Sequence, residues 1–121
     1  MTQKTIKSKI ANNSCLLNKL LNSLNEESLQ PCYNITGAEN VQAFLADTEL
    51  VNTVEGFLEN NLNISKTSQK TFMHRNTLLY RIEKINKLLG LDIRKFEDAI
   101  TLKIMLILNQ RQKASKAKAL I

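Results

Sequence analysis

The sequence has few of the residues on which disulfide-rich, zinc-binding and many-stranded proteins depend. It contains two cysteines, one proline, three glycines and no tryptophan in 121 residues. Two cysteines cannot form a disulfide framework or supply all four ligands of a zinc site. So few glycines and prolines leave little material for the turns of a many-stranded fold. We therefore expect an all-α helical bundle with a core built mainly from leucine and isoleucine.

Long apolar runs are also absent. The longest, residues 104–108, has five residues, whereas about 20 are needed to cross a bilayer. The chain opens with positive charge, but no apolar stretch follows, which argues against a signal peptide. We expect a cytoplasmic protein without a membrane span.

The residue groups that perform catalysis are missing from the sequence. We find no paired acids, no nucleophile–base spacing and no glycine-rich phosphate loop. The single histidine, His74, has no cysteine, histidine or acidic residue at ligand spacing around it, which argues against a metal site. We expect a protein that is not an enzyme and needs no cofactor, and no small-molecule ligand can be inferred.

Charge is arranged in blocks along the chain. The formal net charge is +6; residues 47–61 hold four acids and no base, and residues 62–90 hold six bases and one acid, Glu83. Such blocks predict that acids and bases lie on different surfaces, and a focused positive surface attracts polyanions. A solvated charged face explains the same pattern, so charge alone does not decide the function.

Apolar spacing and capping residues divide the chain into three parts. Residues 1–46 form an N-terminal arm of unknown role, with a helix over 5–29, a loop over 29–37 and a short helix over 38–46. Residues 47–110 form the main domain, with Asp47 and Asn63 or Ser65 as helix N-caps and Asn60-Asn61 and Gly90 as helix ends. Its helices are expected over about 47–59, 63–71, 75–89 and 96–110, and residues 111–121 form a basic tail.

A short helix, a turn of three residues and a longer basic helix is the helix-turn-helix arrangement. Leu78, Ile82, Ile85 and Leu89 share one face of the longer helix, which is expected to be buried. The opposite side presents polar and basic groups, from Arg75, Asn76, Thr77, Tyr80, Arg81, Lys84 and Lys87. Arginine can pair with guanine and asparagine with adenine, while lysine, threonine and tyrosine can hold phosphates. This pattern favours insertion of the helix into the major groove of double-stranded DNA.

Each candidate contact has a plainer alternative. For Arg75, Asn76 and Thr77 the alternative to DNA contact is helix capping and solvent exposure. His74 is favoured as an N-cap or as a packed residue of the turn over a phosphate contact, and Tyr80 suits the edge of the core and DNA equally well. Arg81 and Lys84 are expected to anchor phosphates, and Lys66 lies on the DNA backbone or in solvent. In the turn, Phe72 and Met73 are expected to pack inward.

One run of residues resembles a known family. His74-Arg75-Asn76-Thr77-Leu78, followed by Tyr80-Arg81 and Gly90-Leu91-Asp92, is similar to the C-terminal helix-turn-helix domain of PucR-type regulators of purine catabolism and of sugar-diacid regulators. The resemblance covers about residues 47–108, and it extends to the DNA-binding half of Fis-like proteins. It implies a sequence-specific DNA-binding transcriptional regulator.

Two positions depart from the family pattern. The family usually has alanine at Ser68 and leucine at Thr71. A threonine beneath the recognition helix is expected to cost about 1–3 kcal/mol unless the core repacks. Family members also carry long sensory regions ahead of this domain, and residues 1–46 match none. The alternative function is therefore a truncated interaction module that pairs with a larger regulator.

The last helix is apolar on nearly every side between Ala99 and Leu108. A helix of this kind is buried all round, which a small domain achieves with its N-terminal arm or with a second subunit. We expect a homodimer, with burial inside one chain as the alternative.

Overall fold

The computed structural model describes residues 16, 19–20, 22–24 and 37–119. The chain forms two compact units, Met1–Pro31 and Cys32–Ile121. The helix expected over residues 5–29 lies mostly outside the described residues. Its described apolar positions Leu16, Leu20 and Leu24 are exposed.

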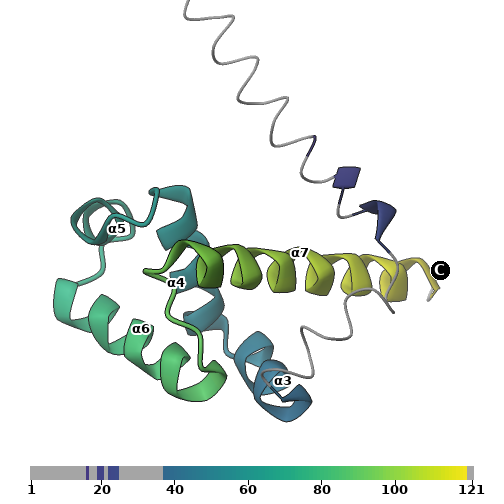
Figure 1. Cartoon of the computed structure of the whole chain (residues 1–121), viewed down its shortest axis with the longest axis horizontal. Coiled ribbons are helices and arrows are strands. Elements are labelled where there is room, and N and C mark those ends of the chain that lie inside the picture. Colours follow the sequence, from purple (N-terminus) through teal and green to yellow (C-terminus); the bar gives the residue numbers. More distant parts are fainter. Residues whose placement is uncertain (1–15, 17–18, 21, 25–36, 120–121) are drawn as a thin grey trace, which may run out of the picture. The chain divides into compact units, whose positions relative to one another are not determined.

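The second unit is all-α, as predicted, with no strand among its described residues. Its helices are α3 (Ala38–Ala46), α4 (Thr48–Glu59), α5 (Ile64–Lys70), α6 (Arg75–Leu89) and α7 (Phe96–Ala119) (Figure 1). Helix α4 is central, because it packs against α3, α5, α6 and α7. None of the described helices is long and apolar enough to span a membrane.

Side chains and backbone conformations set the helix ends as the sequence predicts. The Asp47 carboxylate accepts the Leu50 N–H at 3.2 Å, and the Asn63 side chain accepts the Lys66 N–H at 2.9 Å. Each bond satisfies an N–H that has no partner within the helix. Helix α4 ends before Asn61 and α6 ends at Gly90, both left-handed, with φ of 57° and 70°.

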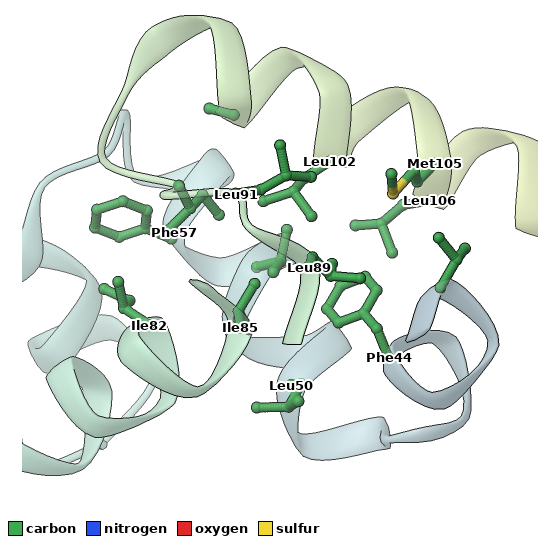
Figure 2. Packing of buried hydrophobic residues seen from close by; sticks show 14 of the residues in the cluster. Phe44, Leu50, Phe57, Ile82, Ile85, Leu89, Leu91, Leu102, Met105 and Leu106 are labelled. Atoms are coloured by element: carbon green, nitrogen blue, oxygen red, sulfur yellow. The ribbon is translucent and has the colours of Figure 1, made fainter. Parts of the chain in front are cut away.

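The predicted stripe of α6 forms one wall of the core. Leu78, Ile82, Ile85 and Leu89 are buried. They pack with side chains from the other helices, including Phe44, Leu50, Phe57, Leu102 and Met105 (Figure 2). Burial of this stripe fixes which side of α6 faces outward, because side chains on a helix repeat every 3.6 residues.

Helix α7 is longer than predicted and less deeply enclosed. It continues to Ala119, so its expected end at Gln110 is wrong. Ala99, Leu102, Met105, Leu106 and Leu108 are buried, Ile104 and Ile107 are half-buried, and Ile100 is 40 % exposed. The described chain therefore covers most of this apolar helix without a second subunit. One stripe, Ile100, Ile104 and Ile107, stays partly uncovered.

Candidate nucleic-acid interface

The turn between α5 and α6 is held by its own hydrogen bonds. The Met73 N–H donates to the Ser68 carbonyl at 3.1 Å, and the Ser68 hydroxyl donates to the Met73 carbonyl. The first bond is typical of a Schellman helix end, in which the residue before the donor is left-handed. Here that residue is Phe72, with a φ of 54°. Ser68 therefore fixes the angle at which the chain enters α6.

The two residues at the centre of this turn behave differently. Met73 is half-buried and packs against the core, as predicted. Phe72 is 96 % exposed, so the expectation that it packs inward is wrong. The left-handed backbone directs its ring away from the domain while the next side chain turns inward.

Thr71 does not lie beneath α6, which corrects the expectation of a weakened core. It is exposed, and its hydroxyl donates to the Thr67 carbonyl at 2.6 Å. Its methyl group faces α4, where a Cβ built on Gly56 would lie 2.9 Å from it. The polar atom is satisfied and no core volume is lost. Thr71 therefore gives no reason to expect an impaired helix-turn-helix.

His74 is the N-cap of α6, as favoured from the sequence. Its Nδ1 accepts the Asn76 N–H at 3.2 Å. An accepting ring nitrogen carries no hydrogen, so in the neutral ring the hydrogen is on Nε2. The side chain is exposed, and this second nitrogen remains available as a donor.

The outward side of the α5–α6 pair presents most of the predicted contacts. The side chains are exposed at Lys66, Arg75, Asn76, Thr77, Tyr80 and Lys87. Tyr80 is 67 % exposed, which places it on the surface and not at the edge of the core. Within the described part of the chain, no ion pair involves Lys66, Arg75 or Lys87. Their charges are thus available to an anionic partner.

Arg81 and Lys84 lie instead against the start of α4. The Arg81 guanidinium is 3.4 Å from the Glu49 carboxylate, and its side chain is 22 % exposed. It also contacts the Met73 sulfur at 3.8 Å. The Lys84 ammonium is 3.9 Å from Asp47. The expected separation of acids and bases onto different surfaces is therefore wrong at this end of α4.

A family model described as the PucR C-terminal helix-turn-helix domain matches residues 50–108. Those residues form a helix-turn-helix domain of the PucR C-terminal type. The match spans most of α4, all of α5 and α6, and α7 as far as Leu108. The helix-turn-helix is an arrangement that many DNA-binding proteins use.

Named relatives of the PucR-type domain are regulators. The purine catabolism regulatory protein of Bacillus subtilis is 34 % identical over 88 residues, 73 % of this chain and 17 % of that protein. The carbohydrate diacid regulator of Escherichia coli is 37 % identical over 60 residues, 50 % of this chain and 16 % of that protein. The proline-responsive transcriptional activator of Bacillus subtilis is 33 % identical over 67 residues, 55 % of this chain and 16 % of that protein.

The matched region therefore spans about a sixth of the length of these relatives. No solved structure matches the chain significantly.

The Gly90-Leu91-Asp92 segment of the PucR-type domain organises the link from α6 to α7. The Asp92 carboxylate accepts the Arg94 N–H at 3.0 Å and the Arg94 Nε–H at 2.9 Å. These hydrogen bonds, opposed by partial burial, hold the pKa of the Asp92 carboxyl below its ordinary value. The Asp92 N–H donates to Asp98 in the first turn of α7 at 2.9 Å.

Arg94 also pairs with Glu83, the single acid of α6, at 3.1 Å. This pair offsets the negative charge on the outward side of the helix.

Proposed function

We propose that this chain is a sequence-specific DNA-binding transcriptional regulator whose recognition helix, α6, enters the major groove. The observation that carries the proposal is the division of α6 into two faces. Leu78, Ile82, Ile85 and Leu89 are buried, while the opposite side exposes amide, phenol and cationic groups within a PucR-type domain. The chain would bind DNA in the cytoplasm without catalysing a reaction and without a cofactor.

The first turn of α6 is proposed to read bases. Arg75, Asn76 and Thr77 are exposed there, and the N-terminal residues of a recognition helix reach the base edges. Arginine can bind guanine O6 and N7 with two hydrogen bonds, and asparagine can bind adenine N6 and N7 in the same way. Thr77 adds a hydroxyl and a methyl group.

Other residues are proposed to hold phosphates. Lys66, Lys87 and the Tyr80 hydroxyl lie on the exposed side of α5 and α6, and His74 can donate from Nε2 while Nδ1 caps the helix. Phosphate contacts position a protein on the duplex without reading its sequence. Arg81 and Lys84 take a secondary role, because Glu49 and Asp47 lie beside them.

Selection of bound sequences from a random pool of duplexes tests this function. The purified chain should enrich a defined motif, because base contacts of this type each discriminate by about 1–3 kcal/mol. A pool that keeps its starting composition after several rounds would contradict the proposal. Failure to bind any duplex at low salt would contradict it more strongly.

We also propose that the regulator is a homodimer, joined through the uncovered stripe of α7. Ile100, Ile104 and Ile107 follow one another at helical spacing and are only partly buried. The stripe adjoins a groove of about 340 Å³ between α4 and α7, which Leu58, Leu106 and Ile107 line together with the polar residues Glu55, Glu59, Lys103 and Gln110. Two recognition helices related by a two-fold axis would have to lie about 34 Å apart to enter successive major grooves.

Sedimentation equilibrium without DNA tests the dimer. The wild-type chain should sediment as a dimer, and Ile104→Glu should give a folded monomer because Ile104 is only half-buried and a charge at a dimer contact is unfavourable. Ala114→Glu is the matched control, since it adds the same charge to an exposed position of α7. A 13.8 kDa wild-type monomer at tens of micromolar would contradict the proposal.

A further inference from the structure

Phe72 combines two features that are unfavourable for a folded domain. Its φ is 54°, a left-handed conformation that costs a residue with a side chain about 1–2 kcal/mol. Its side chain is 96 % exposed, so the ring gains almost no burial. A lone exposed apolar side chain is ordinary on a protein surface. A bulky aromatic residue with a positive φ is not.

The other left-handed residues of the described chain each have a reason within the fold. Gly37 and Gly90 have no side chain to clash, and asparagine, as at Asn61, tolerates this conformation. Leu62, with a φ of 61°, packs against the hydrophobic core. Only Phe72 combines a left-handed backbone with a large side chain that packs on nothing described. Stability of the domain does not explain a phenylalanine at this position.

The surroundings of Phe72 indicate the kind of partner that its ring meets. Lys70, His74 and Arg75 lie within three residues of it, and the sequence has no acid between Glu59 and Glu83. An anionic partner is therefore favoured over a cationic or a neutral one. Phe72 is also two residues before the N-cap of α6, next to the turn proposed to read bases. The anion that already fits this place is DNA.

We infer that Phe72 is a DNA-contacting residue whose ring packs on an apolar group of the duplex at the rim of the major groove. This inference rests on the proposed DNA-binding function. Two sources supply such a group: the 5-methyl group of thymine, which phenylalanine side chains contact in major grooves, and the carbons of a deoxyribose. The left-handed turn then serves to direct the ring toward the duplex.

Phe72→Gly separates contact from folding. Glycine adopts a positive φ without strain, and the lost ring packs on nothing in the described domain. The urea midpoint should therefore stay level or rise. Affinity for the selected duplex should fall by about 4-fold or more per subunit, the effect of uncovering one methyl-sized apolar group. Phe72→Leu should retain part of the affinity, because its side chain is still apolar.

Duplexes with deoxyuridine in place of single thymines distinguish the two sources. If the ring meets a thymine methyl, one substitution should weaken the wild type by about 4-fold and leave Phe72→Gly unaffected. If the ring packs on deoxyribose, every such substitution should act equally on both proteins while Phe72→Gly still binds more weakly.

The inference is overturned if Phe72→Gly, folded as the wild type, binds the selected duplex with unchanged affinity. Asn76→Ala, measured beside it, keeps this failure distinct from failure of the proposed function. Weaker binding of Asn76→Ala with unchanged binding of Phe72→Gly would refute the role of Phe72 alone. Loss of selective binding in the wild type would refute both.

Discussion

The close crossing of α4 and α5 predicts that one substitution, Gly56→Ala, changes the stability of the domain in opposite directions depending on residue 71. A Cβ built on Gly56 would lie 2.9 Å from the Thr71 methyl carbon and 3.8 Å from that of Thr67. Carbon atoms pack at about 3.5–4.0 Å, so only the contact with Thr71 is too short. Gly56→Ala should therefore destabilise the domain when residue 71 is threonine and stabilise it when residue 71 is alanine.

The magnitude follows from three terms. Alanine in a helix interior is more favourable than glycine by about 1 kcal/mol. Against this, an added methyl group in a filled space costs about 1–3 kcal/mol. Thr71 can rotate away only by giving up its hydrogen bond to Thr67, worth about 1 kcal/mol. Gly56→Ala should thus lower the free energy of unfolding by up to about 2 kcal/mol when residue 71 is threonine. Beside Thr71→Ala it should raise the free energy of unfolding by about 1 kcal/mol, since only the helix-propensity term then remains.

Urea unfolding followed by circular dichroism measures the four proteins of this cycle. The coupling free energy between the two positions should be about 2 kcal/mol, within the range seen for residues in contact. The same effect of Gly56→Ala in both backgrounds would refute the reasoning, because it would mean that the Thr71 methyl group does not limit the approach of the helices.

Three further predictions concern charge and capping. Lys87→Gln should reduce the slope of log K against log salt for DNA binding by about 0.9 per subunit, whereas Arg81→Gln should change it less, since Arg81 is paired with Glu49; equal changes in both variants would contradict the division. Asn63→Ala should destabilise the domain by about 1 kcal/mol in urea unfolding through loss of the α5 cap, whereas Ser65→Ala, at a neighbouring exposed position, should have little effect. The hydrogen bonds from Arg94 lower the pKa of Asp92 in the folded state, so its contribution to stability is present above the unfolded pKa of about 3.9 and is lost as the pH falls through the folded value; unfolding of Asp92→Asn should therefore differ from wild type at pH 7, and the difference should shrink as the pH falls below the unfolded pKa, so a difference that persists unchanged in acid would contradict this.

Much of the fold could be predicted because its signals are local. The N-cap Asp47 and the helix end at Gly90 are identified by residue type alone. For α5, residue type left Asn63 and Ser65 as alternatives, and the structure shows Asn63 as the N-cap. The buried stripe of α6 follows from helical spacing. The length of α7 did not follow from the sequence pattern, because residues 111–119 have no apolar period. The helix continues there because lysine, alanine and glutamine favour helix intrinsically.

The candidate site was predictable in composition but not in its pairing. Exposure of Arg75, Asn76 and Lys87 follows from the position of the buried stripe. The pairing of Arg81 with Glu49 depends on the angle at which α4 crosses α6, which no local pattern encodes.

Phe72 shows the same limit at the turn. Helices commonly end with one left-handed residue, and neither Thr71, Phe72 nor Met73 is a residue type that adopts this conformation readily. The sequence therefore contained a signal of strain at this turn, but not the residue that bears it or the direction of its ring.

The affinity of Asn76→Ala for selected and scrambled duplexes tests most directly whether α6 reads DNA sequence. The dissociation constant for the scrambled duplex divided by that for the selected duplex should fall by about 5-fold to 150-fold relative to wild type, the equivalent of about 1–3 kcal/mol. Binding to scrambled DNA should stay nearly the same. Lys87→Ala, on the same exposed face, should weaken both duplexes alike and leave the ratio unchanged. An Asn76→Ala protein that keeps the wild-type ratio would contradict the assignment of α6 as the recognition helix.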